Sequence, residues 1–163
     1  MSWFDVLRSS ILLMALLLSA CGFRMQGADR FPEILASTYV ETGDSYTLFY
    51  RKLRAELEQG DVSVISSSVD ATAIIRIEND ESGQRVLTVS ARNIPTEYEV
   101  YYKVRYSVWR DGAEILPPQS LALFQAYTYD PDLVLGKARE SDTIREALAL
   151  RLARQVSRQL ALL

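Results

Sequence analysis

The most reactive side chain of this sequence is the thiol of Cys21, the only cysteine of the chain. Because the chain has no histidine, serine–histidine and cysteine–histidine catalysis are both excluded. Cys21 follows an apolar run over residues 11–18 and two small residues, Ser19 and Ala20. A short polar start, an apolar segment and small residues at the cut site are the layout of a secretory signal peptide. We therefore expect residues 1–20 to be removed on export.

The end of this segment, Leu18-Ser19-Ala20-Cys21, resembles the lipobox of bacterial lipoproteins. In that family the cysteine thiol receives a diacylglyceryl group, and the new amino terminus is acylated after the signal peptide is cut. The resemblance implies lipidation of Cys21 and a chain held at its membrane by this N-terminal lipid. Gly22 stands where an aspartate would resemble the inner-membrane retention signal. This implies an outer-membrane location, with the body of the protein on the periplasmic side.

Two other interpretations of the segment have to be compared with this one. An ordinary secretory signal followed by an incidental cysteine would give export without the anchor. A membrane-spanning helix needs about 20 apolar residues, and the apolar run is too short for one. Acylation of Cys21 would leave no thiol for a disulfide or a zinc site, and we expect neither a metal nor a cofactor.

The remaining chain has the composition of one globular domain. The whole chain is 48% hydrophobic and 24% charged, with a net charge of −3. Residues 21–36 show no sustained period, so we expect a lipidated N-terminus and a linker there. A single periplasmic domain is then expected over residues 37–163. The weak negative charge gives no electrostatic reason to expect nucleic-acid binding.

The first half of this domain predicts a strand, a helix and a second strand. Residues 37–42 alternate and are rich in β-formers, which indicates a strand. Helical spacing follows over residues 48–57, with a cap expected within Gly43-Asp44-Ser45 and Gly60 expected as the C′ residue. Residues 62–65 predict the second strand. Because a helix connects the two strands, we expect them to be parallel.

From residue 73 onward the pattern is that of antiparallel strands. Residues 73–78 and 85–91 predict two strands that flank a polar turn at 79–84. Strict period-2 alternation over residues 97–109 predicts a long strand. Asp111-Gly112 is a hairpin signal. The returning strand is expected over residues 121–129, with Pro117-Pro118 breaking or bulging its start.

The end of the chain is helical, with Ser141 or Asp142 able to cap the helix. Its apolar row repeats every four residues and consists of Ile144, Leu148, Leu152, Val156 and Leu160. Such a stripe normally packs on a sheet, although a basic helix over residues 141–160 could instead contact anionic lipid headgroups. The predicted fold is therefore α+β, with two helices packed on one face of a mixed, largely antiparallel β-sheet.

The long strand over residues 97–109 has two faces with different chemistry. The tyrosines and valines from Tyr98 to Val108 favour core packing over a ligand platform. The opposite face is aromatic and basic, so it could contact a partner or an amphipathic ligand, although a solvated sheet face would look similar. Its candidate residues are Tyr101, Lys103, Arg105 and Trp109.

The order of these features resembles the LptE family of lipopolysaccharide-assembly lipoproteins. The segments that carry the resemblance are Cys21-Gly22-Phe23-Arg24-Met25-Gln26-Gly27, Asn93-x-x-Thr96-Glu97-Tyr98, Phe124-x-x-Tyr127-x-Tyr129-Asp130 and Leu135-Gly136-Lys137. They span essentially the whole chain after the signal segment and precede a terminal amphipathic helix, as in that family. The weight of the resemblance lies in their order.

The resemblance implies a protein that is not an enzyme. Members of the family sit as a plug inside LptD, an outer-membrane β-barrel, assist its assembly, and take part in delivering lipopolysaccharide to the outer leaflet. It also places Arg92 and Lys137 at basic positions of the family. Arg92 ends a predicted strand, and Lys137 is expected in the loop before the last helix, so we predict that the pair contributes to binding lipid A phosphates. Solvated surface charges would look the same. Two rival classes are a hydrolase, for which no nucleophile motif is present, and an envelope scaffolding lipoprotein with another outer-membrane partner.

Overall fold

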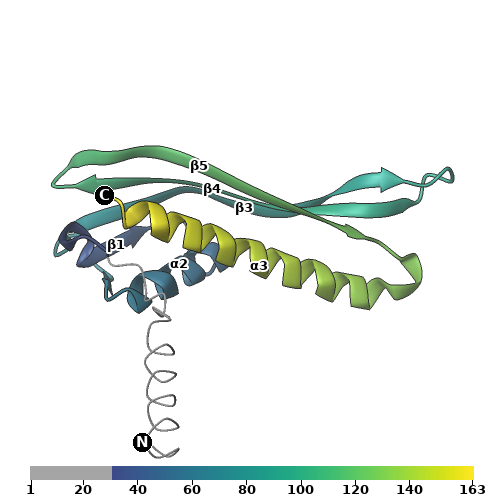
Figure 1. Cartoon of the computed structure of the whole chain (residues 1–163), viewed down its shortest axis with the longest axis horizontal. Helices are drawn as coiled ribbons and strands as arrows, with labels where there is room; N and C mark the ends of the chain where they lie inside the picture. The colour runs from purple at the N-terminus through teal and green to yellow at the C-terminus, as the bar shows by residue number, and fades with distance from the viewer. Residues whose placement is uncertain (1–30) are drawn as a thin grey trace, which may run out of the picture.

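The fold is a five-stranded sheet with two helices packed on one of its faces (Figure 1). A computed structural model describes residues 31–163, so the signal segment, Cys21, Gly22 and most of the expected linker lie outside the described residues. The elements are η1 (Glu33–Leu35), β1 (Ser37–Glu41), α2 (Leu48–Gln59), β2 (Ser63–Ile65), β3 (Ala73–Val89), β4 (Pro95–Arg110), β5 (Ala113–Thr128), η2 (Pro131–Leu133) and α3 (Val134–Leu160). No helix in this part of the chain is long and apolar enough to span a membrane.

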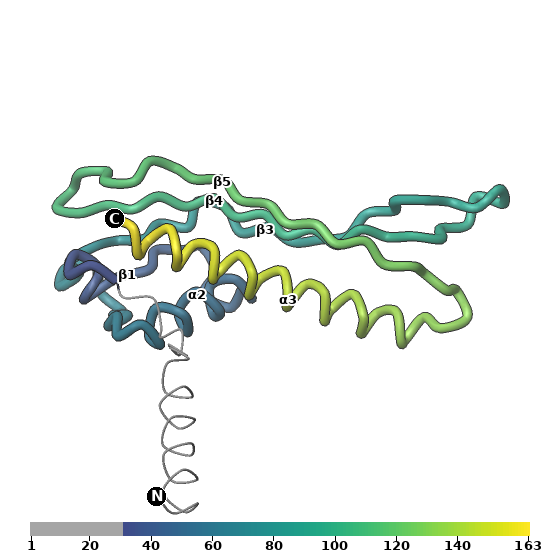
Figure 2. The backbone as a smooth tube through the Cα atoms, viewed as in Figure 1, coloured from purple at the N-terminus to yellow at the C-terminus, as the bar shows by residue number. Residues whose placement is uncertain are grey.

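The strand order in the sheet is β2-β1-β3-β4-β5. β1 pairs in parallel with β2 and with β3, whereas β3–β4 and β4–β5 are antiparallel. This mixed sheet confirms the predicted fold class. The long strands β3, β4 and β5 run beside α3 to one end of the molecule, at the right in Figure 2. We call this end the wide end. It holds the β3–β4 turn, taken here with the adjoining strand ends (residues 86–95), and the β5–α3 turn, taken with η2 and the start of α3 (residues 129–135).

The parallel pair β1–β2 is built by a strand–helix–strand unit, as predicted. The cap of α2 differs from the prediction, because Thr47 and not Gly43-Asp44-Ser45 caps the helix. The Thr47 hydroxyl accepts a hydrogen bond from the Tyr50 N–H (3.2 Å). Gly60 closes the helix at φ −94°, and the residue in the left-handed region is Asp61 at φ 65°. Aspartate tolerates that region, so the chain did not need a glycine there.

The polar turn predicted at residues 79–84 is wrong. β3 runs through it as one continuous strand, and the polar segment pairs residue by residue with β4. A long neighbouring strand supplies hydrogen-bond partners along the whole segment, and this overrides its low intrinsic strand preference. The register shifts between Ile77 and Asn79, which places a bulge beside the start of the polar segment.

β4 and β5 form the hairpin that the Asp-Gly signal predicts, with Asp111 at φ 51° and Gly112 at φ 77°. β5 begins at Ala113, earlier than the predicted start at residue 121. Pro117-Pro118 bulge the strand without breaking it, since the register to β4 shifts in this stretch. Prolines are tolerated here because β5 is an edge strand.

α3 begins at Val134, so Ser141 and Asp142 are not its cap. Ser141 lies inside the helix and is buried. The turn η2 precedes α3 and is itself capped by Asp130, whose side chain accepts a hydrogen bond from the Asp132 N–H (2.9 Å). The first turns of α3 bury no side chain. The apolar pattern that predicts the helix therefore begins at Ile144, well after the first residue of α3.

The core lies between the sheet and the two helices. The predicted inward face of β4 is buried from Val100 to Val108, and Tyr98 is half-buried at its end. The predicted apolar row of α3 is buried from Ile144 to Leu160. Leu35 of η1 is also buried in this core, so the last residues of the expected linker pack on the domain.

Candidate functional site

Toward the wide end, a cleft lies between α3 and the strands. It has a volume of about 520 Å³ and is lined by side chains from β3, β4, β5 and the first turns of α3. We call it the tyrosine cleft, after Tyr98, Tyr127 and Tyr129, and two cations, Lys137 and Arg145, also line it. It exists because the packed part of α3 begins only at its third turn.

The three tyrosines form one aromatic wall. Tyr98 stacks on Tyr127, with ring centroids 6.0 Å apart, and meets Tyr129 edge-to-face at 5.0 Å. Both arrangements are favourable for aromatic pairs, which hold the rings in fixed positions. Such a wall presents apolar ring surface together with hydroxyl groups, so it can contact an acyl chain or a sugar ring.

The side chain of Gln84 joins the sheet and the helix at this cleft. Its Oε1 accepts hydrogen bonds from the Ser141 hydroxyl (2.9 Å) and from the Tyr127 hydroxyl (3.3 Å). Residues from β3, β5 and α3 therefore meet at one oxygen atom. This contact links α3 to the sheet at the point where its burial begins.

Lys137 was predicted to lie in a loop, but the structure places it on α3, where it lines the cleft. Its Nζ pairs with Glu140 at 2.8 Å, and its side chain is 19% exposed. Arg145 similarly pairs with Asp142 at 2.6 Å. Each cation is held by a carboxylate three residues away on the same helix. Such partly exposed pairs contribute little stability, so a ligand phosphate can compete for the cations.

Arg92 lies at the tip of the β3–β4 turn and is exposed. The turn is closed by a hydrogen bond from the Ser90 N–H to the Ile94 carbonyl (2.8 Å), with Asn93 at φ 59°. Within residues 31–163, Arg92 makes no ion pair. Arg92 thus lies on the β3–β4 turn and Lys137 lies on α3, just after the β5–α3 turn. The two turns are at the same end of the molecule (Figure 1), but Arg92 does not line the tyrosine cleft.

Both turns also expose large apolar side chains. On the β3–β4 turn these are Val86, Leu87, Val89 and Ile94, which are 45–48% exposed. On the β5–α3 turn they are Leu133, Val134 and Leu135, which are 54–82% exposed. Arg92 therefore accompanies apolar side chains on the β3–β4 turn, and Lys137 on α3 closely follows those of the β5–α3 turn. This combination suits a ligand or partner that is apolar in one part and anionic in another.

The predicted partner face of β4 is turned away from the helices, but its groups are largely engaged within the sheet. Arg105 pairs with Glu78 at 2.9 Å. The Trp109 indole N–H donates to a neighbouring serine hydroxyl (3.1 Å), and the Arg76 guanidinium lies 4.9 Å from the Trp109 ring centroid. Lys103 makes no ion pair within the described residues. A shallow hollow of about 360 Å³ lies beside Lys103 and Arg105.

Tyr101, on the same face, lies over a glycine of the neighbouring strand. A Cβ at Gly83 would be 2.6 Å from the Tyr101 hydroxyl, so no larger residue fits without movement of the ring. Hydrogen bonding to Glu81 raises the pKa of Tyr101. The Lys103 ammonium lies 4.8 Å from the centroid of its ring. The structure therefore brings Tyr101 and Lys103 together as neighbours and leaves both accessible to a partner.

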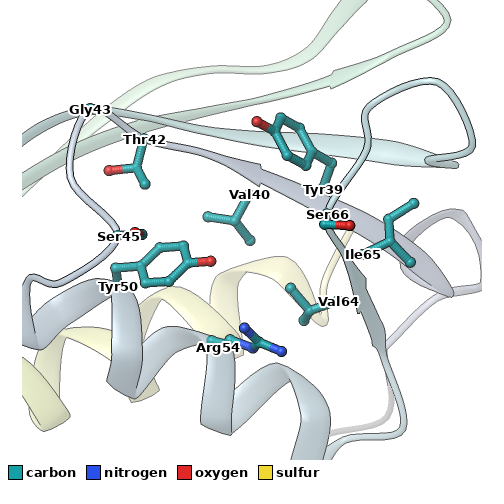
Figure 3. A pocket seen from close by; sticks show the side chains of 10 residues that line it. All are labelled: Tyr39, Val40, Thr42, Gly43, Ser45, Tyr50, Arg54, Val64, Ile65 and Ser66. Carbon is teal, nitrogen blue, oxygen red and sulfur yellow. The ribbon is translucent and has the colours of Figure 1, made fainter.

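A separate hollow lies where β1 and β2 end beside α2 (Figure 3). It has a volume of about 360 Å³, and the Arg54 guanidinium points into it between Tyr50 and Val64. Arg54 is paired with Glu58 at 2.8 Å, and this contact raises the pKa of Arg54. This hollow was not predicted from the sequence. The sequence feature that could have predicted it is the set of hydroxyl residues that follow two parallel strands, because ligands often bind at the ends of such strands.

The tyrosine cleft was also missed as a site. Tyr127 and Tyr129 were noted only through the family resemblance, and Tyr98 was expected in the core. Gln84 was placed in a turn, and Arg145 was not among the candidate residues. Nothing in their spacing indicates a common site, because they come from three strands and a helix that meet only in the fold.

The fold defines a class of small α+β domains that occurs in bacterial lipoproteins of known structure. One is the solution structure of an uncharacterized lipoprotein B from Nitrosomonas europaea, with a TM-score of 0.72, 20% identity, and coverage of 86% of this chain and 90% of that chain. Another is the crystal structure of rare lipoprotein B from Shewanella oneidensis, with a TM-score of 0.66, 22% identity, and coverage of 77% and 93%. These likenesses establish the fold.

The family follows from sequence comparison. The model of the LptE family, described as lipopolysaccharide-assembly, matches residues 35–160. Over 149 residues the chain is 24% identical to the LPS-assembly lipoprotein LptE of Yersinia pestis (strain Pestoides F), which covers 91% of this chain and 72% of that protein. The same values hold for the LptE of Yersinia pseudotuberculosis serotype O:1b. The chain belongs to the LptE family, and its role lies in lipopolysaccharide transport and assembly.

Proposed function

We propose that the chain is an outer-membrane lipoprotein, anchored through Cys21 on the periplasmic side, that plugs the LptD β-barrel and assists its assembly. It takes part in delivering lipopolysaccharide to the outer leaflet, and it acts by binding rather than by catalysis. Membership of the LptE family over residues 35–160 supports the role in lipopolysaccharide assembly. The observation that carries the finer proposal is the wide end, where exposed apolar side chains accompany Arg92 and Lys137.

Lipopolysaccharide has phosphates on lipid A directly above its acyl chains. A protein that binds it therefore needs cations beside apolar groups. Arg92 offers a planar fork for phosphate oxygens, and Lys137 offers a mobile point charge. The tyrosine cleft beside Lys137 offers ring surface to the sugar or acyl part of the glycolipid. A phosphate at Lys137 would replace Glu140 as its partner.

The barrel partner is supported by the apolar side chains on the two turns. Leu133, Val134 and Leu135 lie in water on the isolated domain, although water disfavours such a cluster. Inside a barrel these side chains would be covered by the wall or by loops. The shape of the domain agrees with such a position, because it is long in one direction and only a sheet and one helix layer thick (Figure 1).

The glycolipid proposal is tested with Arg92→Ala combined with Lys137→Ala. We expect lipopolysaccharide binding at low salt to weaken on the order of tenfold or more. The matched control is Arg151→Ala with Arg158→Ala, which removes two exposed cations from the C-terminal half of α3 and should have little effect. The difference between the two variants should shrink at high salt because of screening. If the folded double variant binds lipopolysaccharide as tightly as wild type does, Arg92 and Lys137 are solvated surface charges that do not bind its phosphates.

The partner proposal is tested by purification from solubilised outer membranes. A stable one-to-one complex with a large barrel protein supports the plug. Recovery with a different envelope protein, and without a barrel, would instead favour the scaffolding lipoprotein. The measurement needs no prior assumption about the interface residues.

A further inference from the structure

β5 is the last strand of the sheet. In Figure 1 it follows the upper border of the molecule and then crosses β3 and β4 toward the wide end. One hydrogen bond fixes the direction of its backbone groups, because the Tyr129 N–H donates to the Thr96 carbonyl (2.8 Å). In an antiparallel ladder, hydrogen-bonded and non-hydrogen-bonded pairs alternate. The register is unbroken from Tyr98↔Tyr127 to Tyr106↔Gln119, so the odd-numbered residues of β5 are bonded to β4 over this stretch.

The even-numbered residues of the same stretch therefore direct their N–H and C=O groups to the open edge. These residues are Ser120, Ala122, Phe124, Ala126 and Thr128. Within the described part of the chain, no strand pairs with this side of β5. Water is the available partner for these backbone groups in the isolated domain.

This edge lacks the features that usually prevent strand pairing. In natural proteins, charged side chains, prolines or a short length prevent an edge strand from pairing with another chain. Residues 119–128 contain no charged residue and no proline. Pro117-Pro118 can prevent pairing only along the part of β5 that is closer to the Asp111-Gly112 hairpin. The opposite edge of the sheet, β2, is three residues long.

We propose that this edge of β5 pairs antiparallel with the same edge of a second copy, about a two-fold axis at Phe124. In this register Ser120 lies opposite Thr128 of the second copy, and Ala122 lies opposite Ala126. Hydroxyl then faces hydroxyl, small side chain faces small side chain, and ring faces ring, which are favourable cross-strand pairs. Each outward N–H and C=O from residue 120 to 128 gains a partner, and the two sheets become continuous.

A second copy fits this edge better than other arrangements of the same chain. Pairing β5 with β2 of another copy would leave most of the edge open, since β2 is so short. Two-fold pairing uses the whole edge and closes the assembly. The cation nearest the axis is Arg85, whose guanidinium lies 5.8 Å from the Phe124 ring centroid and is paired with Glu99, so two-fold pairing brings no unpaired like charges together there. Lys103 and Arg105 lie one strand further in, and the two β4 strands would be about 14 Å apart, beyond the screening length of about 10 Å.

The first test removes the outward N–H groups. Ala122→Pro with Ala126→Pro takes away two edge donors per copy and leaves the bonds to β4 intact, because prolines are tolerated on the solvent side of an edge strand. The control, Ala122→Val with Ala126→Val, keeps all donors. In sedimentation equilibrium of the full mature lipoprotein in detergent, we expect wild type and control to dimerise. The proline variant should dimerise on the order of a hundredfold more weakly or not at all.

The second test fixes the register and does not depend on proline. Directly opposite residues of a hydrogen-bonded pair have Cα atoms about 5.5 Å apart, within disulfide range. Phe124→Cys should therefore cross-link to itself under mild oxidation. Ser120→Cys should not cross-link to itself, but should do so when mixed with Thr128→Cys. Wild type measures any background from Cys21.

The proposal does not rest on the proposed function, since it concerns copies of the chain outside any barrel complex. It is overturned by a wild-type protein that stays monomeric at its highest soluble concentration. It is also overturned if the folded proline variant dimerises like wild type, or if Phe124→Cys cross-links no more than Ser120→Cys alone. If the edge instead pairs with an unrelated extended strand, Phe124→Cys would cross-link to itself no more than Ser120→Cys does.

Discussion

Tyr102→Phe is expected to destabilise the domain strongly, although it removes a single oxygen atom. The Tyr102 hydroxyl is buried and makes two hydrogen bonds. It donates to Asp80 Oδ1 (2.8 Å) and accepts from the Phe49 N–H in the first turn of α2 (3.0 Å). The ring stays in place in the variant, so apolar packing is kept. Asp80 Oδ2 has no hydrogen-bond partner, so loss of the Tyr102 hydroxyl removes a donor from a carboxylate that is already incompletely hydrogen-bonded.

The size of the effect follows from the two lost bonds. A hydrogen bond to a charged group contributes about 1.5–3 kcal/mol, and a buried N–H without a partner costs about 1–3 kcal/mol. Water reaches the partly exposed Asp80 and reduces the first loss. We therefore expect Tyr102→Phe to lower the free energy of unfolding by about 2–4 kcal/mol at pH 7.

Tyr106→Phe is the matched control. Its hydroxyl is also in the core but donates to the neutral Gln159 Oε1 (2.6 Å). Burial raises the pKa of Tyr106 to about 12, so this hydroxyl stays protonated in the range of the assay. We expect a loss of about 1 kcal/mol that does not depend on pH.

The pH dependence separates the two variants. Burial raises the pKa of Asp80, and hydrogen bonds from the Thr47 and Tyr102 side chains oppose this rise. The cost of burying the charged carboxylate is therefore complete above the raised pKa and disappears below the ordinary value near 3.8. Loss of the donor raises the pKa of Asp80 further. Destabilisation by Tyr102→Phe should be largest at neutral pH and should shrink as the pH falls through this window.

The assay is urea unfolding followed by circular dichroism, at pH 7 and at several lower values. The reasoning is refuted if Tyr102→Phe costs no more than Tyr106→Phe at pH 7. It is also refuted if the cost of Tyr102→Phe is the same at every pH at which the wild type is folded. Either result would mean that water replaces the hydroxyl at Asp80 and Phe49.

Three further outcomes are expected. Val104→Asp buries an unpaired charge and should lower the free energy of unfolding by about 4 kcal/mol or more. Lys103→Asp should change the free energy of unfolding by less than about 1 kcal/mol. Equal losses of the two variants in thermal melts would mean that the buried and exposed faces of β4 were assigned wrongly. Glu140→Gln removes the carboxylate paired with Lys137 and should strengthen lipopolysaccharide binding severalfold at low salt, while unchanged binding would count against Lys137 as a ligand. Cys21→Ser should leave the precursor unprocessed and unacylated, which mass spectrometry can establish.

The elements predicted well from the sequence are those whose pattern is local and long. The alternation of β4 predicts its buried face, because one strand with one inward face needs only period 2. The four-residue row of α3 predicts the packed part of that helix in the same way. Both patterns come from residues that touch the core, and the core includes Tyr102, Val104 and Leu148.

The predictions from the sequence are wrong for segments whose side chains do not contact the core. Residues 79–84 look like a turn because they are polar and include Gly83, yet β4 pairs with all of them and Tyr101 covers the glycine. The first turns of α3 bury nothing, so no apolar period marks them. The tyrosine cleft lies beside these turns. A site formed by a helix that is not packed on its sheet has no periodic signature in the sequence.

The lengths of the elements explain why the wide end exists. At about 3.3 Å per residue, the 17 residues of β3 span about 55 Å, whereas the 27 residues of α3 span about 40 Å at 1.5 Å per residue. α3 and the shorter α2 cannot cover such a strand from end to end, so the β3–β4 turn must project beyond the core. A projecting hairpin that exposes two valines, a leucine and an isoleucine adds little to the stability of the isolated domain. Under the proposed function, its apolar side chains would be covered by the bound partner or glycolipid. The wide end is therefore the part of the molecule whose composition the proposed function explains and the folding of the isolated domain does not.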